Sequence, residues 1–173
     1  NTSDEDGGAV YLYLLEGSYD DEVFAWNEYV TATIRNNRFN NNHAGQTGNG
    51  GAIRTDFTPI RIESNSFTKN TAGYGGALYI GDLEGHPATQ FLVYLNRNYV
   101  RQNTAHYDGG GFYFLEPWVS CYRNAIIQNQ AVEEGGGVYS QEGWGWFVSN
   151  TVADNVAGTV GGGFRRMLTD NRT

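Results

Sequence analysis

The chain is poor in several residue types that mark particular classes of protein. Its 173 residues contain a single cysteine, Cys121, and a single lysine, Lys69. One cysteine cannot form an intramolecular disulfide, so cysteine pairing does not indicate the redox compartment. Eleven Lys and Arg stand against 19 Asp and Glu, a formal net charge of −8. This acidic balance argues against nucleic acid as a partner, because binding phosphates requires clustered basic residues.

Long hydrophobic runs are missing as well. No apolar run approaches the roughly 18 residues of a membrane-spanning helix, so we expect no membrane insertion by this segment. Aromatic residues make up 14% of the chain, whereas disordered chains contain few of them. Glycine is abundant, with 24 residues, or roughly twice the average usage of about 7%. The composition therefore argues against disorder.

Two short motifs recur in alternation along the chain. The first is a glycine pair followed by a small and an apolar residue, and it begins at residues 7, 50, 75, 109, 135 and 161. The second is N-x-Φ-x-x-N-x-A, with Φ apolar, at residues 37–44, 65–72, 98–105, 124–131 and 150–157. Interleaved motifs of this regularity indicate structural repeats.

The apolar residues of each repeat alternate with a period of two, which is typical of β-strands. We expect three short strands per repeat: one after the glycine pair, one before the first Asn and one between the two Asn. Three strands per turn, stacked in register, predict an all-β fold. Specifically, residues 1–173 should form a single right-handed parallel β-helix segment of about five coils.

Stacking would place equivalent residues of successive coils above one another. Asn occurs at two such positions, and its side-chain amides can hydrogen-bond along the stack. The first predicted ladder contains Asn37, Asn65, Asn98, Asn124 and Asn150, and the second contains Asn42, Asn70, Asn103, Asn129 and Asn155. The Ala that ends each motif fits a tight corner, and Cys121 is interpreted as a small buried hydrophobe.

Two repeats are longer than the others at one corner, between the first and second strands. These insertions lie near residues 16–30 and 81–90 and are rich in carboxylates. Carboxylate oxygens are preferred ligands of Ca²⁺, and a solvated loop surface is the alternative interpretation. The calcium candidates are Asp20, Asp21, Glu22, Asp82 and Glu84. We expect no other metal or cofactor.

Aromatic side chains are predicted to form outward-facing columns. Stacked exposed aromatics can lie under sugar rings or contact a neighbouring protein. Alternatively, Tyr on a strand stacks only to stabilise the solenoid. The candidate contact surface contains Tyr11, Tyr79, Tyr113 and Tyr139 on the first strand, and Trp118, Tyr122, Trp144 and Trp146 on the second.

These motifs resemble the GGA[ILV] and FxxN repeats of the chlamydial polymorphic outer-membrane proteins. The stretches 39–42 and 67–70 match FxxN, and 50–53 and 75–78 match GGA[ILV]. Later repeats have Val or Ile in place of Phe, and Gly in place of Ala. Similar repeats occur in secreted proteins with pectin-lyase-like β-helices. The resemblance implies an extracellular or cell-surface protein, often an adhesive one.

We therefore predict a non-enzymatic structural or adhesive β-helix, which could serve as a filament building block. The alternative is a carbohydrate-active β-helix, either a polysaccharide lyase-like enzyme or a sugar-binding module. Uncovered parallel strands at the ends predict end-to-end self-association or continuation in a longer chain. Carbohydrate or another surface protein is the other expected partner. Asn1 and Asn171 begin N-x-[ST] sequons and are glycosylation candidates.

Overall fold

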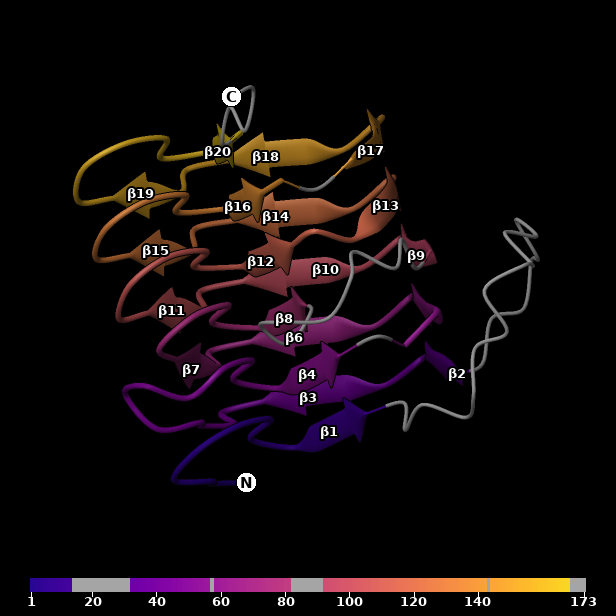
Figure 1. Cartoon of the computed structure of the whole chain (residues 1–173), viewed down its shortest axis with the longest axis vertical. Helices are drawn as coiled ribbons and strands as arrows, with labels where there is room; N and C mark the ends of the chain where they lie inside the picture. The colour runs from indigo at the N-terminus through magenta and orange to yellow at the C-terminus, as the bar shows by residue number, and fades with distance from the viewer. Residues whose placement is uncertain (14–31, 57, 82–91, 143, 169–173) are drawn as a thin grey trace, which may run out of the picture.

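The computed structural model describes residues 1–13, 32–56, 58–81, 92–142 and 144–168. Within these ranges the chain is all-β, and no helix is present that could cross a membrane. Short parallel strands stack into a β-solenoid of about five turns, which confirms the predicted fold class. Figure 1 shows the coils rising from the N-terminus at the bottom to the C-terminus at the top.

Two of the four sheets are built from the longer strands. The first sheet contains, in spatial order, β1 (Val10–Tyr13), β4 (Ile53–Asp56), β8 (Leu78–Gly81), β12 (Phe112–Leu115), β16 (Val138–Gln141) and β20 (Phe164–Met167). The second sheet contains β2 (Ala32–Arg35), β5 (Ile60–Glu63), β9 (Leu92–Asn96), β13 (Trp118–Tyr122) and β17 (Trp144–Val148).

The other two sheets are formed by the Asn-containing motif. The third sheet contains β3 (Arg38–Asn40), β6 (Ser66–Thr68), β10 (Tyr99–Arg101), β14 (Ala125–Ile127) and β18 (Thr151–Ala153). The fourth contains the two-residue strands β7 (Thr71–Ala72), β11 (Thr104–Ala105), β15 (Gln130–Ala131) and β19 (Val156–Ala157). The expectation of three strands per coil is therefore wrong by one. The Ala and the residue before it form a short two-residue strand, where the sequence had predicted only a tight turn.

The register stacks identical motif positions. In the first sheet Ile53 pairs with Leu78, Leu78 with Phe112 and Phe112 with Val138. These side chains are fully buried, as are Phe67, Val100 and Ile126 of the third sheet. Side chains of the first three sheets thus fill one continuous core. Phe39 and Phe67 stack within it at a ring-centroid distance of 5.0 Å.

The glycine pair makes the corner that precedes the first sheet. Gly50 has a φ of 69°, and a Cβ there would lie 2.1 Å from the carbonyl oxygen of Ile53. The next glycine, Gly51, would place a Cβ 2.1 Å from the carbonyl oxygen of Gly76 in the following coil. The first glycine is therefore required by its conformation and the second by the close approach of a neighbouring coil.

The structure shows both Asn columns as hydrogen-bond ladders that run from coil to coil. Asn103 Nδ2 donates to Asn129 Oδ1 at 2.9 Å and to the carbonyl oxygen of Phe67 at 3.0 Å. Its Oδ1 accepts from the backbone N and the Nδ2 of Asn70, both at 2.9 Å. The other column repeats this arrangement, for example from Asn98 to Asn124 at 3.0 Å. Each buried amide is thus satisfied by the adjacent coils.

A left-handed residue comes directly before every ladder Asn. All ten preceding residues have φ between 53° and 57°, and none of them is glycine. Non-glycine residues adopt this conformation at an energetic cost. The Asn that follows offsets the cost, because its side chain bonds to the backbone of the neighbouring coils.

The predicted insertions near 16–30 and 81–90 lie outside the described residues, apart from Gly81, which ends β8. The strands that flank them place both at the same corner, because each links a strand of the first sheet to one of the second.

Candidate functional site

The outer face of the second sheet carries large polar and aromatic side chains. Burial alternates along β9, so that Val93 and Leu95 point into the core while Tyr94 and Asn96 point outward. The parallel register sets Ser120 of β13 beside Tyr94, and Tyr122 beside Asn96. The in-register pairing of the five strands extends this outward direction to the residues paired with Tyr94 and Asn96, and these define what we call the outer face.

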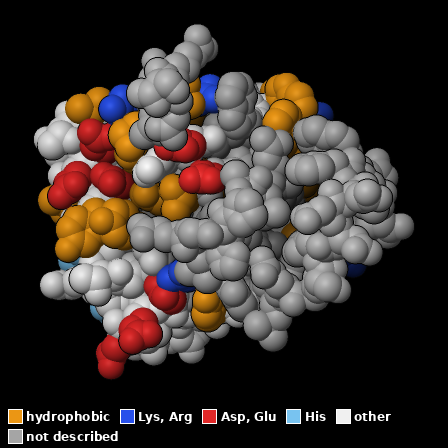
Figure 2. Space-filling model, in the orientation of Figure 1, with side chains coloured by type: hydrophobic (Ala, Val, Ile, Leu, Met, Phe, Trp, Pro, Cys, Tyr) orange, Lys and Arg blue, Asp and Glu red, His pale blue; other side chains and the backbone are white. Residues whose placement is uncertain are grey.

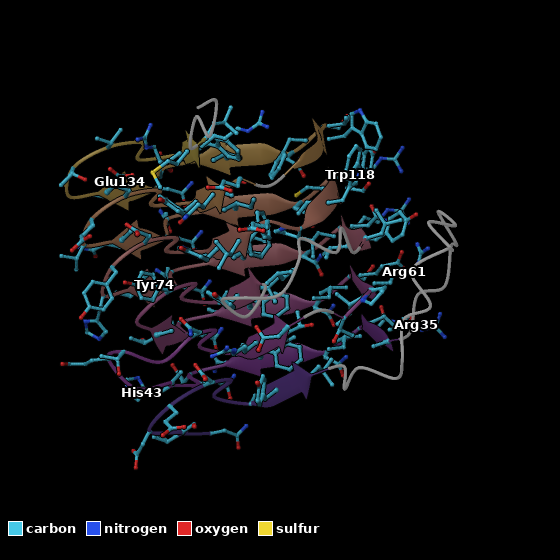
Figure 3. The ribbon with its side chains drawn as sticks, viewed as in Figure 1. Arg35, His43, Arg61, Tyr74, Trp118 and Glu134 are labelled. Atoms are coloured by element: carbon cyan, nitrogen blue, oxygen red, sulfur yellow. The ribbon has the colours of Figure 1, made fainter. Side chains whose placement is uncertain are left out.

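Two tryptophans occupy one part of the outer face. The rings of Trp118 and Trp146 meet edge to face, with centroids 5.7 Å apart. Trp146 is 54% exposed, which is unusual for so large an apolar side chain. Trp144 pairs with Trp118 in the register, but its side chain lies outside the described residues. Of the predicted contact surface, Trp118, Tyr122 and Trp146 therefore share one face. Figure 3 shows Trp118 on the same side of the solenoid as Arg61.

A shallow groove of about 410 Å³ crosses the outer face. Its lining comes from four adjacent strands and the turns that follow them, and includes Arg61, Glu63, Tyr94, Asn96, Ser120 and Tyr122. The Arg61 guanidinium lies over the Tyr94 ring at 4.5 Å from its centroid. Arg61 also forms an ion pair with Glu63, with Nη1 and Oε1 3.0 Å apart. The groove therefore combines ring faces with charged and neutral hydrogen-bonding groups.

Basic residues gather at the edge where the strands of this sheet end. Arg123 follows β13 in a left-handed turn with φ 53°, and Arg97 occupies the same position one coil earlier with φ 54°. Both side chains are exposed, and Arg123 contributes to the lining of the groove. No ion pair holds Arg123 to any residue that the structure describes.

Acidic residues gather elsewhere on the solenoid. Asp108, Glu133 and Glu134 precede the glycine pairs of successive coils, and Glu134 pairs with Arg165 at 2.9 Å. In Figure 2 several carboxylates lie on the left of the molecule, opposite the side on which Figure 1 places the second sheet. Among the described residues, Arg61, Arg97 and Arg123 stand against Glu63 on the outer face and its edge, although the whole chain carries a net charge of −8.

The predicted exposed Tyr column on the first sheet needs correction. Only Tyr11 is well exposed, whereas Tyr79, Tyr113 and Tyr139 are 4–7% exposed. Their rings stack at centroid distances of 5.1 and 5.0 Å, so that each ring covers the next. Burial raises the pKa of Tyr113 above its ordinary value. These three side chains form a packed column, as in the alternative interpretation, and do not offer a contact surface.

One charged cluster escaped the sequence reasoning. Arg54 replaces a Tyr in the same column, and its guanidinium lies 5.3 Å from the ring centroids of Tyr11 and Tyr79. It pairs with Asp6 and, at 2.7 Å, with Asp56. Burial raises the pKa of Asp56, and the bonds from Arg54 oppose this shift. The available signal was the i, i+2 spacing of Arg54 and Asp56, which places both on one side of a strand.

Several predicted site residues cannot be placed. The calcium candidates Asp20, Asp21, Glu22, Asp82 and Glu84, and the sequon residue Asn171, lie outside the described residues. In the part of the chain that the structure describes, no three His, Cys, Asp or Glu side chains group to hold a metal ion. The other sequon residue, Asn1, is exposed, and its Nδ2 donates to Asn42 Oδ1 at 3.0 Å.

Comparison with known protein families identifies the repeat. Residues 38–56 and 66–81 match the family model of the Chlamydia polymorphic membrane protein repeat. Two coils carry this repeat. The matched segments contain both FxxN stretches and two of the three glycine motifs with Ala in the third position. A search of curated proteins and a search of solved structures found no match.

The polymorphic membrane protein repeat indicates the setting of the chain in coarse terms. The family is associated with the outer membrane and the cell surface, and it is generally non-enzymatic. It indicates a surface-exposed protein of the outer-membrane type.

Proposed function

We propose that this chain is a non-enzymatic adhesive β-solenoid of a cell-surface protein, which presents the outer face of its second sheet to a partner. The observation that carries the proposal is the pair Trp118 and Trp146 beside the groove, with Trp146 54% exposed. Exposed clusters of large aromatics mark interaction sites. The rest of the fold serves as a rigid support, because its side chains are used in the core and the Asn ladders.

The content of the groove favours binding over catalysis. Glycoside hydrolysis uses two carboxylates at a fixed separation across the bond that is cleaved. Among the described residues that line the groove, Glu63 is the single carboxylate, and it is paired with Arg61. The groove therefore favours sugar binding over glycoside hydrolysis.

The test is an adhesion assay with beads that carry the purified 173-residue chain, applied to a panel of animal and bacterial cells. We expect beads to adhere to at least one cell type, and the double change Trp118→Ala and Trp146→Ala to abolish the adhesion. The matched control is Tyr99→Ala, which removes a 40% exposed aromatic from the third sheet. Loss of adhesion in the control as well, or no adhesion of the unchanged chain, would contradict the proposal.

End-to-end association or continuation of the stack is a second proposal, and a separate observation favours it. In the last coil Phe147, Val152 and Phe164 are 37–40% exposed, although they belong to core columns. Another coil, from the same chain or from another copy, would bury them. Sedimentation velocity should show concentration-dependent association that Val152→Asp removes. A chain that stays monomeric at high concentration would contradict association between copies.

A further inference from the structure

The groove lies where an aromatic column of the second sheet is interrupted. The outward column contains Arg61, Tyr94, Ser120 and Trp146 on four successive strands. Arg61 covers one face of the Tyr94 ring. On the other side of β9 the next residue is Ser120, which is too small to stack on the ring.

The first sheet shows what an uninterrupted column looks like. There Tyr79, Tyr113 and Tyr139 occupy three successive strands, with rings 5.1 and 5.0 Å apart and almost no exposure. One ring per strand is the natural spacing, since strands are about 4.8 Å apart. At Ser120 one such ring is missing, and the groove extends over this position. A ligand ring stacked on Tyr94 would fill it.

The polar residues that line the groove indicate what kind of ring the ligand would carry. Asn96 and Tyr122 supply amide and hydroxyl groups beside the position of the missing ring, whereas Ser120 itself is 4% exposed. A ring with hydroxyl groups at its rim can hydrogen-bond to these groups while its apolar face lies on Tyr94. This combination fits a sugar ring. The groove volume of about 410 Å³ lies in the usual range for ligand pockets, about 300–1,000 Å³.

The charges at the groove indicate an anionic sugar. Arg61 and Arg123 line it together with a single carboxylate, Glu63, which Arg61 already binds. Arg123 is exposed at the edge and has no ion-pair partner among the described residues. A guanidinium is well suited to a planar carboxylate or a sulfate, because it can donate two parallel hydrogen bonds.

We propose that the groove binds an anionic saccharide, with one sugar ring stacked on Tyr94 above Ser120 and its carboxylate or sulfate group bound by Arg123. The inference rests on the proposed binding role of the outer face and specifies its ligand. Carboxylated and sulfated glycans share this chemistry, so the experiment below tests them separately.

Isothermal titration of the whole chain should compare a uronate hexasaccharide, a sulfated hexasaccharide and a neutral hexasaccharide. We expect at least one anionic sugar to bind at least tenfold more tightly than the neutral sugar. The stronger of the two anionic arms identifies the group that Arg123 recognises. Equal binding of neutral and anionic sugars, or no binding of any, would overturn the proposal. Equally tight binding of a polyglutamate peptide would also overturn it, because a peptide carries the charge without the ring.

Two variants test the two parts of the site. Arg123→Gln should weaken anionic binding at least tenfold, and Ser120→Tyr should abolish it by filling the missing ring position from within the protein. Because the added ring can stack on Tyr94, as Tyr79 stacks on Tyr113, the second variant should keep its melting temperature. The control is Arg38→Gln, which removes the same charge from an exposed site on the third sheet. Equal losses in Arg123→Gln and Arg38→Gln, or normal binding by Ser120→Tyr, would overturn the proposal.

Adhesion and saccharide binding can fail independently. If beads adhere to cells but neither anionic sugar binds or competes, the inference about the ligand is wrong and the adhesive role stands. If an anionic sugar binds as expected but beads adhere to no cell, the ligand assignment stands and the adhesive role is wrong.

Discussion

The coil built from β12 to β15 and the last coil, built from β17 to β20, differ in burial although they carry the same motifs. Both contain GGGF, yet Phe112 is fully buried and Phe164 is 40% exposed. In the third sheet Ile126 is fully buried and its neighbour Val152 is 38% exposed. The strands pair in the same register in both coils. The difference lies in what covers them, since the earlier coil has neighbours on both sides.

This comparison distinguishes the direction in which a side chain points from the extent to which it is buried. The alternation of residues determines whether a side chain points inward, and it acts within one coil. The area removed from water depends on the next coil, as expected for an array in which each repeat contacts only its neighbours. Identical substitutions should therefore have unequal effects in the two coils.

The sharpest expected contrast concerns Cys121, which lies under the last coil and pairs with Phe147. Burial raises the pKa of its thiol from 9.0 to about 12. At pH 8 the thiolate fraction is then lower by roughly a thousandfold, because each pKa step is a factor of ten. We expect the folded chain to react with iodoacetamide at least about a thousandfold more slowly than the chain in guanidinium. Mass spectrometry can follow this single site.

Phe147→Ala should speed the labelling of Cys121, because it loosens the strand that covers the thiol. A native labelling rate close to that of the unfolded chain would show that the last coil does not stay closed over β13.

Truncating the two equivalent phenylalanines, Phe112 and Phe164, should lower the free energy of unfolding by unequal amounts. Phe112→Ala leaves a cavity in a fully buried site, which typically costs about 3–5 kcal/mol. Phe164→Ala acts on a partly exposed side chain and should cost less than about 1 kcal/mol. Guanidinium denaturation followed by circular dichroism measures both. Equal losses would mean that the last coil is buried in solution by another molecule.

The Asn ladder should show a smaller version of the same contrast. Asn103→Leu removes the side-chain partners of Asn70 and of the Phe67 carbonyl oxygen, at a cost of about 1–3 kcal/mol. Asn155→Leu in the last coil should cost less, because the Asn155 side chain is partly exposed and makes three hydrogen bonds, whereas that of Asn103 makes four. Thermal melts of the two variants compare them directly. A larger loss for Asn155→Leu would contradict this account.

The smallest expected effect is a pH dependence from two carboxyls in the better-covered coils. Burial raises the pKa of Asp56 and of Asp108 above 3.8. The folded state then binds more protons than the unfolded state, so stability should fall as the pH rises from 3.8 through the folded-state pKa values.

Asp108→Asn should reduce this slope relative to the unchanged chain. Denaturant melts between about pH 4 and 7 measure the slope. A steeper slope in Asp108→Asn would mean that folding lowers the pKa of Asp108, which would contradict this account.

Much of the fold could be predicted because each motif repeats one physical requirement. Gly50 marks a positive φ, the Asn columns mark hydrogen-bond ladders, and alternation marks the inward side chains. The short fourth sheet was missed, because two residues such as Thr71 and Ala72 show no periodicity. The left-handed residues before each Asn include Ser, Arg, Lys, Gln and Asp. Their conformation follows from position in the coil and not from residue type.

The candidate site could be predicted only in part. The alternation placed Trp118, Tyr122 and Trp146 on an outer face, and the structure places them there. The same alternation placed Tyr113 outward, but it could not show that its neighbours' rings cover it. The groove depends on a small residue, Ser120, between larger ones. Such a gap becomes visible only once the strands are aligned across three coils.

Because all four sheets pair in register, the length of the solenoid can change only by whole coils. Asn103 and Asn129 are 26 residues apart, and residues 110–135 contain one strand of each sheet. Removing such a unit would bring Leu78 beside Val138 with every column intact, and would shorten the stack by one strand spacing of about 4.8 Å. A gene that gains or loses this unit changes how far the solenoid reaches in steps of fixed size, without redesign of the remaining coils.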